Sequence, residues 1–435
     1  MANPEKKETH ELRKTIHCIK VGIAMTLVSL YYYTNPWSNI NSQGAAMWAV
    51  MTVVVVFEFT VGGCLYKGLN RAVATLIAGC LALGIHWIAS LSGDRFEPVI
   101  LGLSVFVLAS IATFYRFVTF IKVWFDYGVT IFILTFSLIA VSGYKQDTLF
   151  TLAQQRLYNI GIGIFICLLV CVLICPVWAG EDLHLLIIWN MEKLANSLEG
   201  CIAEYFKEGG VLLAVDEDQE AIIQRSEGYK HILSSKPSED SLAILARWEP
   251  GHGCYGFRHP WNQYLKIGAA MRLCAYCLES LAGCIDSQTQ VPESMKRHLS
   301  EACIKLSTNS SRILKELAKC IKFMKKSKYI DLLIRDQNNA VKELDRALRS
   351  LPPMEAMENF GCVSLLEGRV LITAASLLIE ISARIIGVVE AVNLLAEQAC
   401  FKPAKDQVED EGMISSKTSF VVTLGPQAIR TIEEA

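Results

Sequence analysis

Five basic side chains inside or beside long apolar stretches are the residues best placed to do chemistry. They are Lys67, Arg71, Arg116, Lys122 and Arg156. Lys67 and Arg71 lie four residues apart, so on a continuous helix they would share one face. Fixed charges of this kind can replace part of the hydration that an anion loses on leaving water, as they do in anion pores. The alternative is that the first four anchor the chain at the lipid headgroups and only set its topology.

Two carboxylates, Glu58 and Asp126, share these apolar stretches. A carboxylate there needs a basic partner or a proton, because an isolated charge is costly in an apolar environment. The simpler interpretation is a pair of salt bridges that hold neighbouring helices together. A proton-coupled site is the alternative, although no chain of histidines or carboxylates accompanies either residue.

These side chains belong to six apolar stretches that fill the first part of the sequence. Each has 17 to 21 residues, which is long enough to cross a bilayer as a helix. We expect the spans at 16–33, 45–63, 72–91, 99–115, 123–141 and 157–177. Residues 1–180 hold only 20 of the 84 Lys, Arg, Asp and Glu residues. The uneven charge predicts a membrane domain followed by a more polar domain.

The basic residues around the expected spans are unevenly divided between the two sides of the membrane. If the N-terminus is cytoplasmic, nine Lys and Arg lie on the inner side and three on the outer side, which fits the positive-inside rule. An even number of spans then places the second half in the cytoplasm. We therefore expect a transmembrane pore domain at 1–178, a cytoplasmic helical domain at 179–400 and a tail without regular structure at 401–435.

The second half has the hydrophobic spacing of helices and no sustained alternation typical of strands. Helical patterns begin near 181 and continue at about 217–234, 238–247, 261–285, 291–327, 328–350 and 355–398. The last of these is apolar, but Glu380, Arg384 and Glu390 interrupt it, so we expect a buried bundle helix. A basic stripe at the end of the pattern at 291–327 is either a solvated face or a contact with anionic lipid or a cytosolic anion; it consists of lysines 315, 319, 322, 325, 326 and 328. The fold class is therefore all-α, with six transmembrane helices followed by a helical bundle.

The sequence contains no motif of a known enzyme class. A Walker loop, a dinucleotide fingerprint, GxSxG and HExxH are all absent from the sequence. Cys274 and Cys277 form a CxxC without the second ligand pair that a zinc site requires. We expect no enzymatic activity, no cofactor, no bound metal and no nucleic-acid partner.

Three segments of the sequence resemble the aluminium-activated malate transporter family of plants. They read AMWAVMTVVVVFEFTVG at 46–62 with KGLNR at 67–71, CPVWAGEDLH at 175–184, and ARWEPGHG at 246–253 with FRHPW at 257–261. The resemblance runs from about residue 12 to about residue 350. It implies an anion channel for malate and other small anions, built as a homodimer in the lipid bilayer. It also implies that basic side chains of the spans line the path, Lys67 and Arg71 through the KGLNR match, and Arg116 and Arg156 less distinctively.

The resemblance further implies that Glu249 of the WEP tripeptide acts in transport or gating. Trp248 can bury a large ring and Pro250 can stop a helix. Glu249 would accept hydrogen bonds from Arg247, Arg258 or a lysine near the membrane and so couple the bundle to the pore. A purely structural cap is the alternative.

Two other functions are compatible with the residues: a proton-coupled exporter of organic anions and a membrane-anchored scaffold. The few acids within the spans argue against proton coupling. The residues of the RWEPGHG and FRHPW segments are more similar to family members of the plasma membrane, and the vacuolar membrane is the alternative. Only Asp94, Glu97 and Asp147 are acidic in the outer loops, so we expect little aluminium binding there.

Overall fold

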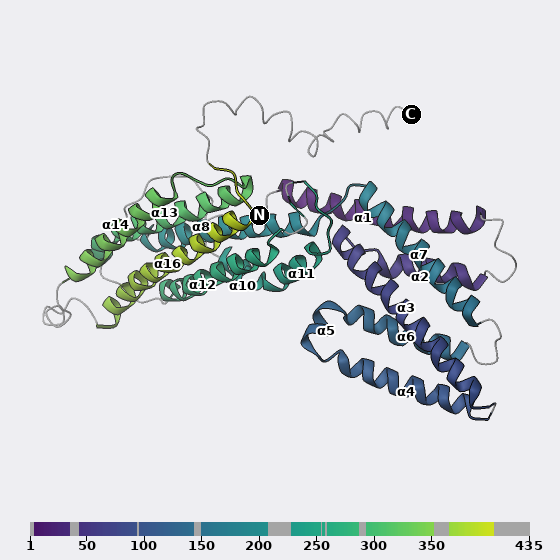
Figure 1. Ribbon diagram of the computed structural model, residues 1–435. Coiled ribbons are helices and arrows are strands. Elements are labelled where there is room, and N and C mark those ends of the chain that lie inside the picture. Colours follow the sequence, from purple (N-terminus) through teal and green to yellow (C-terminus); the bar gives the residue numbers. More distant parts are fainter. Residues whose placement is uncertain are drawn as a thin grey trace, which may run out of the picture.

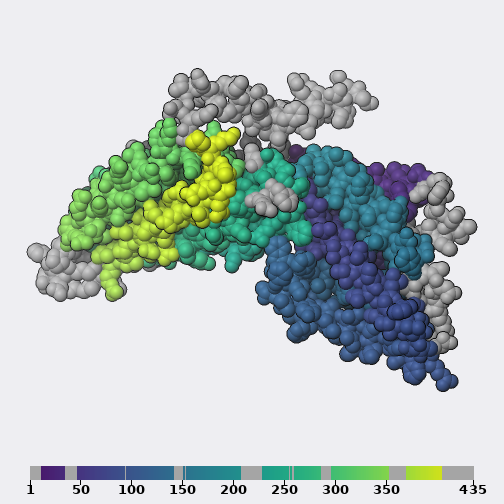
Figure 2. All heavy atoms as spheres, in the orientation of Figure 1, coloured from purple at the N-terminus to yellow at the C-terminus, as the bar shows by residue number. Residues whose placement is uncertain are grey.

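The computed structural model describes residues 4–34, 43–93, 95–142, 149–207, 228–253, 255–256, 259–286, 293–351 and 365–403. Within these ranges the regular elements are helices, with two isolated β-bridges and no strand. Figures 1 and 2 show two bodies of helices side by side, with the N-terminal helices in purple and blue and the later ones mostly in green and yellow. The expected all-α class is confirmed.

The N-terminal body contains the apolar helices of the expected spans. They are α1 (Pro4–Thr34), α2 (Gln43–Val56), α3 (Val61–Leu91), α4 (Glu97–Tyr115), α5 (Thr119–Trp124), α6 (Asp126–Ser142) and α7 (Leu149–Leu173). Parts of α1, α3, α4 and α7 are long and apolar enough to cross a membrane, whereas α2 and α6 hold the shorter apolar segments Met47–Val56 and Asp126–Val141. One apolar core joins α1, α2, α3 and α7, and a smaller core joins α3, α4 and α6. The helix α3 therefore belongs to both cores.

The boundary between the second and third expected spans was wrong. We expected a span at 45–63, a link carrying Lys67 and Arg71, and a new span at 72; instead α2 ends at Val56 and α3 already begins at Val61. The Thr60 hydroxyl accepts a hydrogen bond from the Gly63 N–H at 3.1 Å and so caps α3. The apolar sequence continues through this cap, so the pattern gave no sign that one helix ends and another begins there. Lys67 and Arg71 therefore lie inside α3.

Smaller corrections apply to the fifth and sixth spans. The fifth was expected at 123–141, but α5 ends at Trp124 and α6 begins at Asp126, whose carboxylate suits the first turn of a helix. The sixth was expected at 157–177, but α7 occupies Leu149–Leu173. It ends before Cys175, which has a φ of 41°, and Pro176 follows.

The second body is a bundle of helices around one large core. It contains α8 (Ala179–Lys207), α10 (Gly228–Ser234), α11 (Lys236–Ala246), α12 (Trp261–Asp286), α13 (Glu293–Phe323), α14 (Ile330–Arg349) and α16 (Leu365–Gln398). These helices match the expected patterns closely. The pattern at 217–234 is described only from residue 228, and of the expected tail only 401–403 is described.

Two bundle helices, α12 and α16, are also long and apolar enough to cross a membrane by length and composition. Their apolar side chains instead pack into the core of the bundle, including Tyr264, Met271, Leu378 and Ile385, each with no exposed surface. Glu380 and Arg384 pair with each other along α16 at 2.8 Å. The packing agrees with the expected buried bundle helix.

Candidate anion path and its junction with the helical bundle

Lys67, in the first half of α3, forms an ion pair with Glu58 of the short link before that helix. Its ammonium group also lies 5.8 Å from the centre of the Tyr127 ring. Glu58 was expected to find a basic partner, and the pairing with Lys67 confirms this. The positive charge of Lys67 is thus balanced within the chain.

Arg116, at the end of α4, binds both carboxylate oxygens of Asp126. Its Nε donates to Oδ1 at 2.7 Å and its Nη2 to Oδ2 at 3.2 Å, which is the two-pronged geometry that guanidinium groups favour. The expected salt bridge of Asp126 is therefore confirmed. Lys122 lies exposed in the last turn of α5, and its charge interacts with Asp126.

Arg71 differs from these residues because its charge has no carboxylate partner among the described residues. Only 4% of its surface is exposed. Its Nη1 donates to the Tyr127 hydroxyl at 3.5 Å, and its Nε has no hydrogen-bond partner in the described part of the chain. An unpaired guanidinium group in a buried position retains its capacity to bind an anion.

Arg156, near the start of α7, is the second such group. It is 9% exposed, and its guanidinium carbon lies 4.6 Å from the centre of the Trp48 ring of α2. Its Nη1 lacks a hydrogen-bond partner within the described ranges. The helices that carry the two arginines contact each other, because Gly68 of α3 packs against Ile164 of α7.

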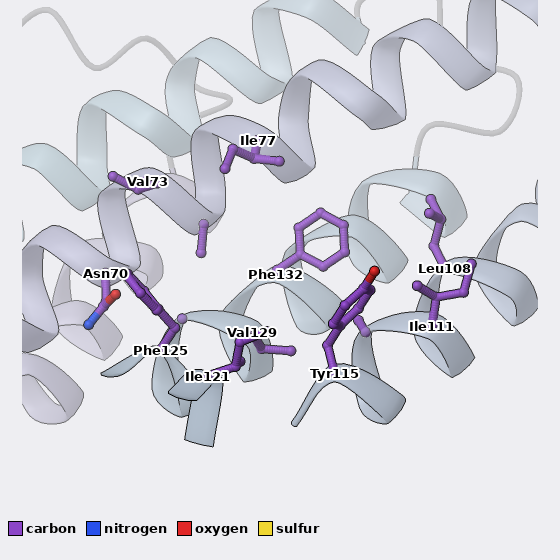
Figure 3. A pocket seen from close by; sticks show the side chains of 13 residues that line it. Asn70, Val73, Ile77, Leu108, Ile111, Tyr115, Ile121, Phe125, Val129 and Phe132 are labelled. Carbon is purple, nitrogen blue, oxygen red and sulfur yellow. The ribbon is translucent and has the colours of Figure 1, made fainter. Parts of the chain in front are cut away.

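A cavity of about 450 Å³ lies between α3, α4, α5 and α6, and Asn70 is one of its lining residues. Figure 3 shows its lining, in which Asn70 and the Tyr115 hydroxyl are the polar groups among side chains such as Ile77, Leu108 and Phe132. Apolar walls of this kind do not replace the hydration of an anion. The lining of this cavity therefore offers little stabilisation to an anion.

Glu249 joins the two bodies of the molecule. Its side chain is 5% exposed and accepts three backbone hydrogen bonds. Oε1 accepts from Ala179 N–H at 2.6 Å and Gly62 N–H at 3.3 Å, and Oε2 accepts from Gly180 N–H at 3.0 Å. One carboxylate thus caps the N-termini of α3 and α8 together, where the helix dipoles favour negative charge.

These donors differ from the ones that we expected for Glu249. Arg247 instead hydrogen-bonds Asn262, and its guanidinium carbon lies 5.1 Å from the centre of the Trp124 ring. Arg258 lies outside the described residues. Burial raises the pKa of Glu249, and the three backbone N–H groups act in the opposite direction. The cap that we kept as an alternative is present, and it also links α3 to the bundle.

The neighbours of Glu249 complete this junction. The Trp248 ring lies edge-on to Tyr66 of α3 at 5.7 Å, and its Nε1 has no partner among the described residues. The Pro250 carbonyl lies 2.9 Å from Nδ1 of His252, whose ring stacks on Trp178 at 3.8 Å. The WEP segment thus contacts α3 and the link between α7 and α8.

Sequence reasoning missed two basic residues of α1 at the junction. Lys20, which is 1% exposed, donates to the Cys175 carbonyl at 2.7 Å, and Arg13 pairs with Asp182 of α8 at 2.9 Å. Both belong to the nine inner basic residues of the positive-inside count. The available signal was the position of Lys20 inside an apolar stretch, where a lysine needs a nearby acceptor.

Gly180 allows close approach at the junction. A Cβ atom there would lie 2.5 Å from Cη2 of Trp261 and 3.3 Å from Oε2 of Glu249. We expect Gly180→Ala to lower the free energy of unfolding by about 1–3 kcal/mol through overpacking. Thermal unfolding of the purified protein measures this, with Gly161→Ala as control because nothing lies within 4 Å of that position. An equal effect of both variants would contradict the tight contact.

Two buried histidines of the bundle share one tyrosine. The Tyr264 hydroxyl lies 3.0 Å from Nδ1 of His184 and 3.2 Å from Nε2 of His259. Burial lowers the pKa of each histidine from 6.5 to about 4, with a further contribution from His259 at His184. Both histidines are therefore neutral in the folded protein near pH 7.

This lowered pKa predicts acid sensitivity of the bundle. The unfolded histidines bind protons below about pH 6.5 and the folded ones only near pH 4, so their stabilisation is present above 6.5 and is lost as pH falls towards 4. We expect the unfolding temperature to drop by several degrees over this range. The double variant His184→Gln/His259→Gln should flatten the profile, and the exposed His298→Gln should leave it unchanged.

The fold and these basic side chains define a multi-pass helical membrane protein. The model of the family described as "Aluminium activated malate transporter" matches residues 7–359, and the chain belongs to this family of transporters. It is 47% identical to Aluminum-activated malate transporter 10 of Arabidopsis thaliana over 89% of this chain and 83% of that protein. It is 43% identical to Aluminum-activated malate transporter 2 of the same plant (90% and 76%) and to Aluminum-activated malate transporter 1 of Triticum aestivum (91% and 84%).

Proposed function

We propose that this protein is a gated anion channel that passes malate and other small organic or inorganic anions across a plant membrane. The observation that carries the proposal is the pair of buried guanidinium groups, Arg71 and Arg156, that have no carboxylate partner among the described residues. The names of the relatives supply the substrate class. A dicarboxylate that loses water on entering the membrane would regain hydrogen bonds and opposite charge at these two groups.

Lys67, Arg116 and Lys122 have a different role in this proposal. Since Glu58 and Asp126 already balance the first two, a passing anion must compete with a carboxylate of the protein itself for each of them. This competition keeps binding weak enough for the anion to leave, which conduction requires. Lys122, exposed beside Arg116, raises the local concentration of anions at the entrance.

Gating is assigned to Glu249, with Trp248 and Pro250 positioning it. The carboxylate binds the first turn of α3, and Arg71 lies on the same helix nine residues beyond Gly62. A movement of the bundle that shifts α8 therefore acts on α3 through one side chain. Such a two-sided contact supports coupling between the bundle and the path.

The proposal includes a pore domain at 1–178 and a cytoplasmic domain at 179–400. It also includes a homodimer, and the plasma membrane in preference to the vacuolar membrane. The positive-inside count supports the cytoplasmic side for the bundle. We propose a transport protein without enzymatic activity.

Ion currents from the purified protein in planar bilayers test this function. We expect currents that rise steeply with voltage in symmetrical malate and that persist without a pH gradient. Flux that requires a pH gradient would instead indicate a proton-coupled exporter. Absence of both current and flux would favour a membrane-anchored scaffold, and either outcome would overturn the channel.

A further inference from the structure

Six exposed lysines gather where α13 and α16 end; we call them the lysine cluster, and they are Lys319, Lys322, Lys325, Lys326, Lys328 and Lys402. The turn after α13 and the segment after α16 are joined by backbone hydrogen bonds. Lys326 N–H donates to the Lys402 carbonyl at 2.9 Å, and Lys402 N–H donates to the Met324 carbonyl at 3.0 Å. The buried Phe401 anchors the second segment in the core. The fold therefore brings Lys402 next to the basic stripe, which in the sequence ends at Lys328.

The two short sequence segments that form the lysine cluster are rich in lysine. Residues 319–329 and 400–403 contain no Asp or Glu. Glu316, one turn earlier, lies 3.7 Å from Lys319 and accepts a hydrogen bond from Ser327 at 2.7 Å. Phe323 and Tyr329, 61% and 63% exposed, lie among the lysines. Lysines around exposed aromatic rings are typical of surfaces that contact the membrane interface.

The lysine cluster lies at the end of the bundle that faces the membrane helices. Gln263, near the start of α12, donates to the Ala391 carbonyl at 2.9 Å, which places the end of α16 beside the start of α12. Trp261, the first residue of α12, packs against Gly180 at the start of α8, six residues after α7 ends. In Figure 1 the yellow end of α16 points towards the side of the bundle where the N-terminal helices lie.

We propose that the lysine cluster binds the anionic phospholipid headgroups of the leaflet that the bundle faces. This inference rests on the cytoplasmic placement of the bundle in the proposed function, because the cytoplasmic leaflet is the anionic one. Its negative potential acts over about 8 Å at physiological ionic strength, so the long lysine side chains at the membrane-proximal end must approach it closely. Binding there would hold the bundle at a defined height above the bilayer and bias the Glu249 junction.

Lysine acetylation of the full-length protein in nanodiscs tests the proposal without requiring any current. Rates are measured by mass spectrometry in phosphatidylcholine alone and in phosphatidylcholine with phosphatidylserine. We expect acetylation of Lys322, Lys326 and Lys402 to slow about fivefold in the anionic discs, and high salt to remove the protection. Lys305 lies 20 residues before Lys325 on α13 and pairs with Glu343, so its rate should not depend on lipid.

Matched variants separate lipid binding from a change in fold. In the anionic discs Lys322→Gln/Lys402→Gln should return Lys326 to its rate in neutral discs, whereas Lys305→Gln/Lys342→Gln should leave it protected. Equal rates in both kinds of disc would overturn the proposal. So would equal protection by soluble inositol hexakisphosphate in neutral discs, because the cluster would then bind a soluble anion. Protection from acetylation does not depend on ion conduction. A protein that shows this protection but no current would therefore refute the channel and leave the lipid-binding proposal standing.

Discussion

Replacing Arg71 with glutamine is expected to reduce malate current more than tenfold while the protein still reaches the membrane. Arg71 is buried and carries a charge that no described carboxylate balances. At an effective dielectric constant of about 20, one charge contributes about 3–4 kcal/mol to the energy of an anion within roughly 4–6 Å. Glutamine keeps hydrogen-bond donors but removes this attraction, so the barrier for a doubly charged anion rises most.

Single-channel conductance and reversal potentials in malate and chloride measure this effect. The double variant Glu58→Gln/Lys67→Gln should have a smaller effect than Arg71→Gln, because it removes both members of an ion pair and leaves the net charge unchanged. Arg95→Gln serves as the control for an arginine on an exposed surface and should change the conductance less than twofold, because exposed charges contribute little energy. Normal malate conductance and selectivity in Arg71→Gln would remove Arg71 from the path.

Replacing Glu249 with glutamine is expected to change the open probability strongly and to leave the permeability ratio of malate to chloride nearly unchanged. One oxygen of the Glu249 carboxylate accepts from Gly180 N–H, and the other accepts from Ala179 and Gly62 N–H. In glutamine one of these two oxygens becomes an NH₂ group, which donates and cannot accept, so the hydrogen bonds on that side are lost. Loss of such buried bonds costs about 1–3 kcal/mol, which corresponds to roughly a 5- to 150-fold shift in an equilibrium. The shift favours whichever state leaves the ends of α3 and α8 uncapped.

Steady-state currents and single-channel records distinguish gating from permeation in this variant. Glu390→Gln, an exposed carboxylate of α16, is the matched control and should behave as the unmodified protein. A changed permeability ratio with an unchanged open probability would place Glu249 in the path itself. Glu249→Ala is less informative, since it removes every acceptor and is expected to lower the unfolding temperature as well.

Much of the fold follows from local sequence. Six apolar stretches predict membrane helices because burial in lipid depends on composition and length, and the periodic spacing of the second half predicts bundle helices because one face must pack. The first turn of α8 was recognisable from Glu181 and Asp182, and α16 from the charges that interrupt its apolar run. The three segments at 46–71, 175–184 and 246–261 together predicted the family.

The boundaries and the state of each charge depended on tertiary structure. Apolarity extends continuously through the end of α2 and the start of α3, so the Thr60 cap was concealed and Lys67 and Arg71 were assigned to a link. Folding decides which basic residues have their charge balanced by a carboxylate and which remain able to bind an anion. Lys67 is paired with Glu58, whereas Arg71 has no such partner among the described residues. Residue types alone do not distinguish the two cases.

The partners of Glu249 show the same limit most clearly. Its donors are the backbone N–H groups of Gly62, Ala179 and Gly180, which lie 187, 70 and 69 residues away in sequence. Every residue except proline carries such a donor, so the sequence offers no signal for which ones a carboxylate will meet. Lys402 likewise joins the lysine cluster only through a backbone contact with the turn after α13. Composition and periodicity thus determined the helices and the family, whereas the packing of helix ends decided which charges are balanced and which can act, because long-range contacts have no local pattern in the sequence.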